Sequence, residues 1–339
     1  MKKVLVTGGT GYLGSWIVKN LLEKGYDVQL PVRDKFKTFK YDNLINIASS
    51  AAGSLTIWEA DLLKEGSYME PMKDCEIVFH TASPFKLNVK DPQKELIDPA
   101  LIGTKNVLSS VNKTQSVKRL VLTSSVAAIY GDNIDMGYQG LKQFDESHFN
   151  SSSSLHHQPY SFSKTQAEKT AWDMVNIQKR WDLVVINPGF IMGPVLSKSS
   201  SSESIIFMKD IIEGKFSVGA PNLSIGYVDV RDVALAHILV AERQKANGRH
   251  ILVNETYKVF QVTNIVKDLF GNMFNLPKSE APKWLMVLIG PLFGVTRKFI
   301  KRNIGYPIAF NNSKSKKELG MRYTPMKTTI KDMIDSIQK

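Results

Sequence analysis

Short apolar runs alternate with amphipathic segments through the first half of the chain. The first run, Lys3–Thr7, leads into a glycine-rich turn, and the segment Tyr12–Lys24 then repeats its apolar residues with helical spacing up to Gly25. Further apolar runs rich in β-branched residues lie at Asp27–Val32, Leu55–Trp58, Ile77–His80, Leu120–Thr123 and Leu183–Asn187. Helical patterns separate them at Tyr41–Ser50, Pro92–Asn112 and Tyr160–Lys179. Strands that are apolar throughout, alternating with helices, predict a parallel sheet covered on both faces.

The alternation stops after Asn187. Serine-rich stretches at Ser151–Ser154 and Ser197–Ser204 are typical of loops, and two more helical patterns follow at Val230–Arg243 and Val262–Phe274. We therefore predict an α/β protein with a doubly wound parallel sheet and a smaller α+β C-terminal lobe. The predicted boundaries are residues 1–187, with 223–245 returning, for the nucleotide-binding domain, and 188–222 with 246–339 for the substrate-binding lobe.

The most apolar stretch of the chain is WLMVLIGPLFGV, Trp284–Val295, which Gly290 and Pro291 interrupt. We interpret it as a core or pocket-lining helix, and a contact with a membrane surface is the alternative. No window of 18 apolar residues occurs, so we expect no transmembrane helix. The apolar run at the N-terminus is too short for the core of a signal peptide.

Composition narrows the class of protein. Cys75 is the only cysteine, which excludes a disulfide framework and a cysteine-based metal site. We expect a reducing, cytoplasmic location. The net charge of +12 raises the possibility of a nucleic-acid partner. However, no nucleic-acid-binding motif accompanies the densest basic clusters, Arg297–Arg302 and Lys314–Lys317. We expect solvated faces and attraction for an anionic cofactor rather than binding to nucleic acid.

Three glycines directly follow the first predicted strand. Gly8, Gly11 and Gly14 stand between that strand and the first predicted helix. In such a loop the first glycine permits a tight turn, the second lets a pyrophosphate approach the backbone, and the third lets helix and strand pack closely. The helix N-terminus offers free N–H groups and a partial positive charge to the phosphates. The loop predicts a dinucleotide site.

The end of the second predicted strand indicates which dinucleotide is bound. An NAD site usually has an acidic residue there, whereas this chain has Arg33, which can pair bidentately with a 2′-phosphate. Asp34 complicates this interpretation, but basic residues surround it. We predict NADP(H), with Lys40 as a second phosphate contact. Asp61 and Leu62, after the third strand, lie where adenine contacts usually occur.

The stretch PYSFSKTQAEK begins the predicted helix at Tyr160. Tyr160 and Lys164 are four residues apart, so they project from the same face of that helix. Such a pair can be a proton donor with an electrostatic partner, or two unrelated surface side chains. The spacing alone does not decide between them.

Five motifs together resemble the extended short-chain dehydrogenase/reductase superfamily. They are GGTGYLG, HTASP (His80–Pro84), TSSVAAIYG (Thr123–Gly131), YSFSK and NPGFIMGP (Asn187–Pro194), and the resemblance covers roughly residues 1–243. The most similar branch contains dihydroflavonol 4-reductase, cinnamoyl-CoA reductase and yeast-type methylglyoxal and aldehyde reductases. The basic segment after the second strand and YVDVRDVALAHI (Tyr227–Ile238) resemble that branch. The resemblance implies a Rossmann-type fold and an NADP(H)-dependent reduction of a carbonyl.

The resemblance also implies roles for three residues. Tyr160 is the expected general acid/base, and Lys164 is expected to lower the tyrosine pKa from about 10 toward neutrality and to hold the nicotinamide ribose. A serine after the Leu120–Thr123 strand should hydrogen-bond the substrate oxygen. Ser124 and Ser125 are both candidates, and the pattern of the family favours Ser125.

Further contacts follow from the same resemblance. The expected cofactor contacts are Gly8, Gly11, Tyr12, Leu13, Gly14, Arg33, Lys40, Asp61, Leu62, Thr81, Ala82, Ser83, Thr123, Tyr160, Lys164, Pro188, Gly189 and Ile191. The expected wall of the substrate pocket consists of Ser83, Pro84, Phe85, Ser125, Tyr130, Phe190 and Met192. Such a wall suits an aromatic or alicyclic ketone or aldehyde. Many relatives dimerise through two helices, which here are Pro92–Asn112 and Tyr160–Lys179, so a homodimer is expected.

Some positions depart from the patterns of the family. Asn106 follows the Gly-Thr pair instead of preceding it, so we do not assign it the proton-relay role of an asparagine on that helix. The long hallmark of cinnamoyl-CoA reductases is absent at Tyr130–Ile134, which argues against a thioester substrate. No set of spaced carboxylates joins the three histidines before Tyr160, so we expect solvated or substrate-loop side chains and no metal. They are His148, His156 and His157.

Three alternatives remain open. A sugar-nucleotide epimerase or dehydratase, or a 3β-hydroxysteroid dehydrogenase, uses the same fold. An epimerase holds NAD tightly, and the basic residues around Arg33 count against that. A non-enzymatic NADP-sensing regulator usually lacks the Tyr/Lys pair that this chain retains. Nucleic-acid binding would show as salt-dependent affinity for random DNA.

Overall fold

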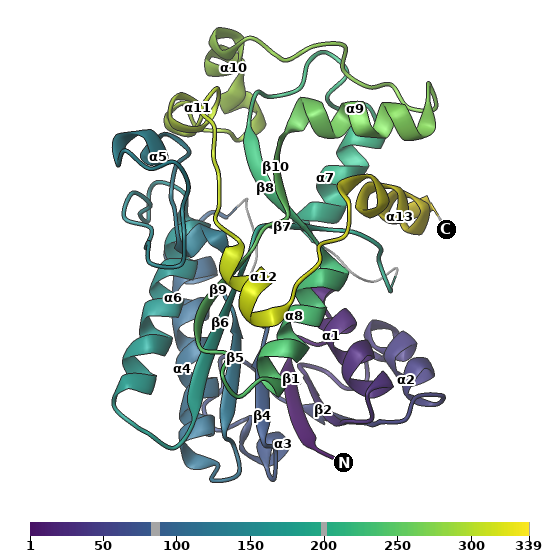
Figure 1. The fold of residues 1–339 in the computed structure, drawn as a ribbon, viewed down its shortest axis with the longest axis vertical. Helices are drawn as coiled ribbons and strands as arrows, with labels where there is room; N and C mark the ends of the chain where they lie inside the picture. Colours follow the sequence, from purple (N-terminus) through teal and green to yellow (C-terminus); the bar gives the residue numbers. More distant parts are fainter. Residues whose placement is uncertain (83–88, 198–201, 339) are drawn as a thin grey trace.

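The large sheet of the molecule has seven parallel strands. The computed structural model describes residues 1–82, 89–197 and 202–338. The sheet order is β3-β2-β1-β4-β5-β6-β9, and every pair of neighbours is parallel (Figure 1). The strands are β1 Lys3–Thr7, β2 Asp27–Val32, β3 Ser54–Glu59, β4 Ile77–His80, β5 Arg119–Thr123, β6 Asp182–Pro188 and β9 Gly248–Leu252. The chain order reverses between β1 and β4, which opens a crevice at the carboxyl ends of these two strands. The predicted doubly wound sheet is confirmed.

Helices cover both faces of this sheet. On one face α1 (Tyr12–Glu23) packs beside α8 (Val230–Glu242), with α2 (Asp42–Ala48) next to α1. On the other face α4 (Asp98–Lys113) packs beside α6 (Pro159–Asn176), and α3 (Met69–Met72) contacts α4. Shorter turns are η1 (Thr38–Lys40), the π turn η2 (Gln93–Ile97), η3 (Val126–Ala128) and the helix α5 (Ile134–Tyr138). Each face of the apolar strands is therefore buried against a helical layer, as the sequence pattern predicts.

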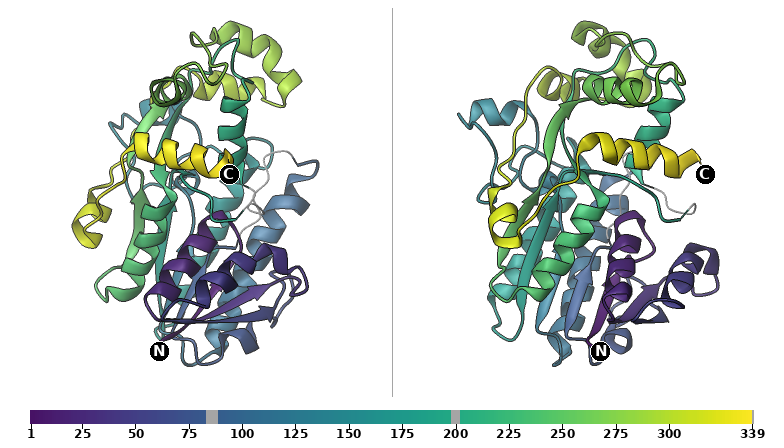
Figure 2. Two further views of the ribbon diagram at one scale, coloured as in Figure 1. Left: turned by 90° about the vertical axis from the view of Figure 1, so that its right-hand side faces the viewer. Right: turned by 45° about the vertical axis from the view of Figure 1, so that its right-hand side comes forward.

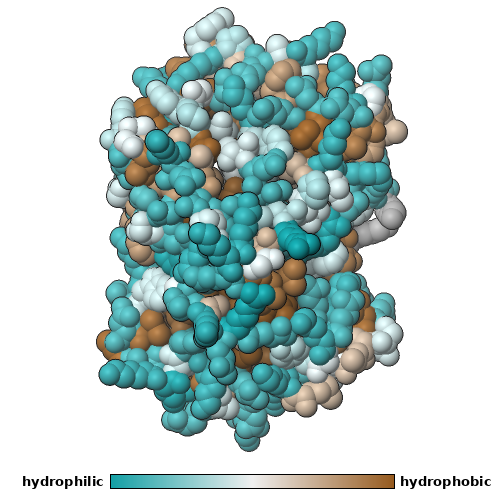
Figure 3. Space-filling view, viewed as in Figure 1, coloured by the Kyte–Doolittle hydropathy of each residue, from teal (hydrophilic) through white to brown (hydrophobic). Residues whose placement is uncertain are grey.

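A smaller lobe lies over the carboxyl-end edge of the large sheet (Figures 1 and 2). Its sheet joins β7 (Phe190–Met192) in parallel to β8 (Ser224–Asp229), and β8 antiparallel to β10 (Glu255–Lys258). Three amphipathic helices share an apolar core with this sheet, namely α7 (Glu203–Ile212), α9 (Val259–Phe270) and α13 (Met326–Gln338). The remaining elements are α10 (Lys283–Ile289), η4 (Gly290–Phe293), α11 (Arg297–Asn303) and α12 (Ser313–Leu319). The face shown in Figure 3 is mainly hydrophilic, with hydrophobic residues in small groups.

Two strands lie elsewhere than the expected boundaries place them. β8 falls within the segment expected to return to the nucleotide-binding domain, but it pairs in the small sheet. β9 falls within the expected lobe, but it is the last strand of the large sheet. Gly248–Leu252 contains a charged residue and a histidine, Arg249 and His250. An ion pair of Arg249 with Glu168 and a 3.0 Å contact of His250 Nε2 with the Glu318 carboxylate accompany their burial. The division of the chain into two domains stays a proposal, with these strand positions refining it.

The prediction that Trp284–Val295 forms a core helix is wrong. α10 has no buried residue, and Trp284, Leu288 and Leu292 are largely exposed. Gly290 is the buried point of this region, because a Cβ there would lie 2.5 Å from the Ile300 side chain of α11. Within the described ranges, no helix combines the length and apolar content that are required to cross a bilayer.

Candidate active site

The glycine loop between β1 and α1 is tightly packed. Gly8 has a φ of +68°, and a Cβ there would lie 2.8 Å from the backbone of Ala82. A Cβ on Gly14 would lie 2.2 Å from the carbonyl oxygen of Gly8. Gly11 precedes the first residue of α1, and no side chain caps that end of the helix. The backbone therefore forms a cradle without side chains at an uncapped helix N-terminus, which fits the pyrophosphate of a dinucleotide.

The side chains of Tyr12 and Leu13, which follow Gly11, contact other parts of the protein. The Tyr12 hydroxyl donates a 2.6 Å hydrogen bond to the carbonyl oxygen of Gly193, which joins α1 to the smaller lobe. Leu13 packs against apolar residues of both the large-sheet core and the lobe core. Their predicted contact with the cofactor would therefore be made by their backbone N–H groups, which have no partner within the first turn of the helix.

Hydrogen bonds to Thr7 hold the end of β4 against the glycine loop. The Thr81 hydroxyl donates to the Thr7 carbonyl oxygen at 2.7 Å, and the Ala82 N–H donates to the Thr7 hydroxyl at 3.2 Å. His80 Nδ1 lies 2.8 Å from the same hydroxyl. Burial, and then the positive charge of Lys164, lower the pKa of His80 to about 3, so this imidazole is neutral. Thr81 and Ala82 consequently stand beside the glycine loop, and their contact with the cofactor stays a prediction.

The end of β2 presents unpaired positive charge. Arg33 is exposed, and it has no ion pair with an acid among residues 1–82, 89–197 and 202–338. Asp34, its acidic neighbour, accepts a hydrogen bond from the N–H of Phe36 and pairs with Lys37 at 3.2 Å. These contacts lower the pKa of Asp34. Asp34 is therefore engaged within its own loop, which leaves Arg33 available to an anionic ligand.

The other residues that are predicted to contact the adenosine part of the cofactor lie in η1 and after β3. Lys40 ends η1 and is exposed. Asp61 Oδ1 accepts the N–H of Leu63 at 2.9 Å, and the carbonyl oxygen of Leu62 accepts the Asn106 side-chain amide at 3.0 Å. Asn106 thus supports the loop after β3 rather than reaching the end of β5. Two exposed rings in the Arg33–Lys40 loop, Phe36 and Phe39, were not predicted as site residues.

Ser125, Tyr160 and Lys164 come together at the end of β5. Ser125 starts η3 in an extended conformation, and its hydroxyl accepts the Ala127 N–H at 3.1 Å. The same hydroxyl shares a hydrogen bond with the side chain of Tyr160. Lys164 Nζ lies 5.9 Å from the centre of the Tyr160 ring, one turn further along α6. The predicted trio is therefore assembled by one strand end and one helix face.

Burial has the largest effect on the pKa values of Tyr160 and Lys164. It raises the pKa of Tyr160 above its usual 10, and the hydrogen bond from Ser125 opposes this rise. Burial also lowers the pKa of Lys164 to about 8, while the negative charge of Glu168 opposes this fall. We expected the lysine to bring the tyrosine toward neutrality. Burial is the largest influence on the pKa of Tyr160, because the loss of hydration disfavours the phenolate, and the effect expected of the lysine stays a prediction.

Ser124 is committed to a different partner. Its hydroxyl donates to the carboxylate of Glu168, which is fully buried on α6. Asn187 donates to the same carboxylate at 2.9 Å and to the carbonyl oxygen of Ser125 at 3.1 Å. Arg249 of β9 forms an ion pair with Glu168 at 2.6 Å. This buried network fixes the backbone of Ser125 and the turn of α6 beyond Lys164, and it leaves the Ser125 hydroxyl for the active site.

A second buried network anchors the start of α6. Asp132 is fully buried, and His157 Nε2 lies 2.8 Å from its carboxylate. Asn303 and Gln158 donate side-chain hydrogen bonds to Asp132 at 2.7 and 2.6 Å, and Arg302 forms an ion pair with it. Gln158 has a φ of 54°, a left-handed conformation that is rare outside glycine, immediately before α6. The smaller lobe is thus linked through Asp132 to Gln158, the residue that precedes α6.

This network corrects the expectation for the three histidines. His157 is buried and bonded to Asp132, so it is neither solvated nor free to reach a substrate. His148 pairs with Asp145 at 2.8 Å, and His156 is exposed. No group of three His, Cys, Asp or Glu in the described part of the chain has an arrangement that could hold a metal ion.

The residues that are predicted to flank the nicotinamide lie where β6 turns into β7. Gly189 is confined there, because a Cβ would lie 2.4 Å from the carbonyl oxygen of Gly226. Pro188 ends β6 and Ile191 lies in β7, which puts both beside that turn. The Thr123 hydroxyl lies 2.8 Å from His237 Nε2 of α8, so this side chain is directed to the helical layer rather than into the site.

Aromatic side chains stand around the end of β5 and in β7. Tyr130 packs against Phe144 and Phe310, with ring centres 5.7 and 5.4 Å apart. Phe190 stands in β7 with its ring edge-on to neighbouring rings of the lobe. Met192 is fully buried in the lobe core, so in this structure it does not reach an open pocket. Three other predicted wall residues, Ser83, Pro84 and Phe85, lie outside the described residues.

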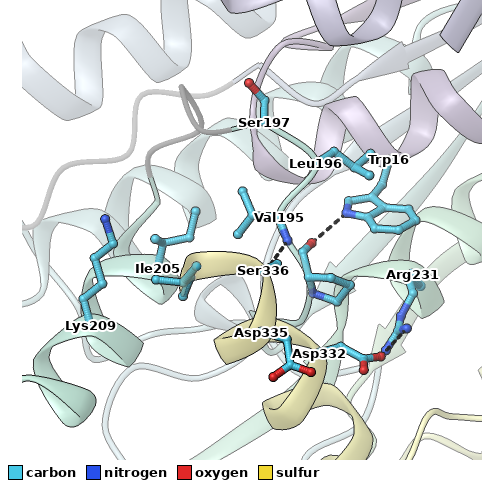
Figure 4. Close-up of a pocket in the computed structure, with 12 residues that line it drawn as sticks. Trp16, Val195, Leu196, Ser197, Ile205, Lys209, Arg231, Asp332, Asp335 and Ser336 are labelled. Atoms are coloured by element: carbon cyan, nitrogen blue, oxygen red, sulfur yellow. Dashed lines mark hydrogen bonds and ion pairs between the residues drawn. The ribbon is translucent and has the colours of Figure 1, made fainter. Parts of the chain in front are cut away.

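A cavity of about 730 Å³ lies between Trp16 of α1 and residues of α7 and α13 (Figure 4). Trp16, Val195, Ile205, Arg231 and Asp332 are among the residues that line it. The indole N–H of Trp16 donates to the Pro194 carbonyl oxygen at 2.9 Å, which shapes one wall. None of Ser125, Tyr160 and Lys164 contributes to this cavity. It is therefore separate from the candidate active site.

A family model agrees with the motifs and the fold. The model described as "NAD dependent epimerase/dehydratase family" matches residues 4–254. Cinnamoyl-CoA reductase CAD2 of Medicago truncatula is 37% identical over 99% of this chain and 95% of its own length. Dihydroflavonol 4-reductase of Gerbera hybrida is 34% identical over 78% of this chain and 72% of its own length.

Solved structures show the same similarity. Gre2 of Candida albicans in complex with NADPH has a TM-score of 0.79 at 28% identity, covering 100% of this chain and 99% of its own. Yeast methylglyoxal/isovaleraldehyde reductase Gre2, also complexed with NADPH, has a TM-score of 0.79 at 27% identity, covering 99% and 98%. Both similarities extend over the smaller lobe as well as the large sheet.

Proposed function

Because the chain belongs to the NAD dependent epimerase/dehydratase family, in its branch of cinnamoyl-CoA and dihydroflavonol 4-reductases, we propose that it reduces a ketone or aldehyde to an alcohol. The observation that carries the proposal is the assembly of Ser125, Tyr160 and Lys164 at one strand end. A proton donor, a hydrogen-bond donor and a cation are the groups that carbonyl reduction requires beside its hydride source.

NADP(H) is the cofactor. The prediction from Arg33 and Lys40 agrees with the two structural neighbours that were solved with NADPH. Gly8, Gly11 and Gly14 would receive the pyrophosphate, and Arg33 would pair with the 2′-phosphate through its planar fork of donors. When bound, NADPH supplies the hydride that reaches the carbonyl carbon.

The side chains of the chain supply the rest of the chemistry. Tyr160 would donate its phenolic proton to the carbonyl oxygen as negative charge develops there. Positioned proton transfer of this kind contributes about 10²- to 10⁴-fold in rate. Ser125 would donate a hydrogen bond to the same oxygen, and loss of one such donor costs about 10²- to 10³-fold in kcat. Lys164 would stabilise the phenolate that remains after the transfer.

Tyr160 is in its proton-donating form at neutral pH, because burial raises its pKa. A phenol with a pKa above 10 is fully protonated at neutral pH, so it can donate a proton but cannot accept one. The reverse oxidation of an alcohol needs the phenolate and would therefore gain from alkaline conditions.

The aromatic residues around the site suit a flat, apolar carbonyl compound. Tyr130 and Phe190 offer rings that can pack on an aromatic or alicyclic substrate. A cinnamoyl-type thioester is the second candidate, because CAD2 of Medicago truncatula is a cinnamoyl-CoA reductase. The missing hallmark at Tyr130–Ile134 counts against the thioester.

The test is the loss of NADPH absorbance with a panel of carbonyl compounds. The panel contains flavonoid and steroid ketones, cinnamyl aldehydes, small dicarbonyls and a cinnamoyl thioester, with NADH in parallel. Turnover with NADPH that Tyr160→Phe abolishes would support the proposal and identify the substrate class. Tight NADPH binding without turnover of any compound would favour the NADP-sensing regulator instead.

We also propose that two copies associate through α4 and α6. Family resemblance is the support for this contact, which would bring the same helices of both copies together. Sedimentation at micromolar concentration measures it, and a monomer under those conditions would contradict it.

A further inference from the structure

α10 and η4 hold large apolar side chains in solvent. Trp284, Leu288 and Leu292 are 70%, 62% and 84% exposed, and they recur every fourth residue. Trp284 and Leu288 therefore lie on the same side of α10. The region packs inward through Gly290, which meets Ile300 of α11. These three side chains, here named the apolar ridge, are an ordered surface of the folded lobe.

The neighbouring helix α11 borders the ridge with positive charge. Arg297, Lys298 and Lys301 are exposed, and no acid in the described ranges forms an ion pair with any of them. Arg297 donates a 3.3 Å hydrogen bond to the carbonyl oxygen of Val287 in α10, which fixes the two helices side by side. The segment 281–302, which contains α10 and α11, has five Lys and Arg residues and no Asp or Glu.

The ridge stands at one end of the molecule. α10 and α11 form the upper end of the smaller lobe in Figure 1, and the view in Figure 2 from the side shows them at the same end. The N-terminus of the chain lies at the opposite end. A surface placed there can approach a large flat partner without interference from the sheet or its helices.

We propose that the apolar ridge and α11 dock the protein on an anionic lipid bilayer. Trp and Leu side chains beside Lys and Arg are the composition of helices that lie in the interface of a membrane. The ridge would enter the headgroup region, while the cations of α11 attract lipid phosphates within a Debye length of the surface. The exposure of Trp284, Leu288 and Leu292 thus favours the surface contact that the sequence leaves as the alternative.

A second copy of the chain fits this surface less well. A symmetric contact through the ridge would bring α11 of one copy near α11 of the other. Arg297, Lys298 and Lys301 would then face like charges without an acidic residue between them. An anionic bilayer removes this repulsion and covers the apolar side chains at once. The inference does not depend on the catalytic proposal, since it concerns another part of the lobe.

Flotation of the full chain with vesicles tests the docking. Vesicles of phosphatidylcholine alone are compared with vesicles of equal parts phosphatidylcholine and phosphatidylglycerol, at low and high salt. We expect binding to the anionic vesicles that weakens with salt. Trp284→Ser/Leu288→Ser should lower the partition coefficient at least about tenfold, because two large apolar side chains no longer become buried. Lys298→Gln/Lys301→Gln should lower it by about thirtyfold, because each lysine near an anionic surface contributes about 1 kcal/mol.

Matched variants separate docking from bulk charge and hydrophobicity. Ile177→Ser changes an apolar residue that is 84% exposed at the end of α6, and Lys316→Gln/Lys317→Gln removes the same charge from α12. Both should float like the parent protein. Equal flotation of the ridge variant and the parent would overturn the proposal, as would equal losses in the α11 and α12 variants. Dimers in sedimentation that the ridge variant abolishes would assign the surface to a second copy and also overturn it.

Discussion

The hydroxyl of Ser124 donates a hydrogen bond to the buried carboxylate of Glu168. The next residue, Ser125, directs its hydroxyl to Tyr160 instead. Extended backbone at the end of β5 sends neighbouring side chains to opposite sides, which explains the division. The sequence leaves both serines as candidates, and the hydrogen bonds distinguish them: Ser124 belongs to the supporting network and Ser125 to the proposed active site.

Replacement of each serine by alanine should therefore have different effects. Ser125→Ala should lower kcat for carbonyl reduction by about 10²- to 10³-fold, because a hydrogen bond to the developing oxyanion is lost. Its free energy of unfolding should change little. Ser124→Ala should mainly destabilise the fold, by about 1–3 kcal/mol, because a buried carboxylate loses a donor. Steady-state kinetics and urea unfolding of both variants measure the two effects. If Ser124→Ala lost kcat and Ser125→Ala lost stability instead, Ser124 would be the catalytic serine.

The pH dependence of reduction should follow Lys164. Its pKa is lowered to about 8, so its positive charge is present below that pH and lost above it. Tyr160 remains protonated over the same range, because burial raises its pKa above 10. We expect kcat/KM for reduction to be level below pH 8 and to fall above it.

Lys164→Arg tests the assignment of this alkaline limb. Arginine stays charged across the accessible range, so the fall near pH 8 should disappear even if the overall rate is lower. Persistence of the same limb in this variant would show that another group is responsible for it.

The sequence predicts the large sheet better than the smaller lobe. All six strands expected before Pro188 form, because continuous apolar runs signal buried parallel strands locally. The same pattern does not predict β9, because this strand contains Arg249 and His250. These two side chains are buried against partners that lie far away in the chain. The exposure of Trp284 could not be predicted from the sequence either, because an apolar run does not show whether it faces the core or the solvent.

For the candidate site, the sequence predicts the proposed catalytic residues but not the residues that support them. Ser125, Tyr160 and Lys164 follow from motifs, because the chemistry fixes residue types and spacing. The supporting residues do not follow from any motif. Glu168 stands four residues after Lys164, and a carboxylate on the inward face of a helix is a weak signal for a buried partner. Asp132 and Arg302 meet only because the chain returns to α11 after most of the lobe is built.

The cofactor preference should depend on Arg33. Arg33→Ala should raise KM for NADPH by about 10- to 100-fold, since a charge-assisted hydrogen bond contributes about 1.5–3 kcal/mol. KM for NADH, which lacks the 2′-phosphate, should stay the same. Lys73→Ala changes an exposed lysine that follows α3 and serves as the control. An equal rise in KM for both cofactors would mean that Arg33 supports the loop rather than the phosphate.

Glu168→Gln should alter both stability and the pH profile. Glutamine keeps the shape of the side chain but leaves Arg249 without its ion pair, and breaking a buried pair costs about 3–5 kcal/mol in free energy of unfolding. The negative charge of Glu168 also raises the pKa of Lys164, against the effect of burial. Its removal should lower the pKa of Lys164, so the alkaline limb should move to lower pH. Urea unfolding and the pH profile of kcat/KM measure the two effects.

Glu242→Gln supplies the control for this variant. Glu242 pairs with Lys24 at the surface, where both side chains are well exposed to solvent. Such a pair contributes about 0–1 kcal/mol, and it lies far from Lys164 in the fold. This variant should therefore unfold like the parent and keep the limb near pH 8. If Glu168→Gln lost stability but kept the limb unchanged, Glu168 would support the fold without tuning Lys164. A shift in the limb would instead establish that the Glu168 carboxylate acts on the active site through its charge.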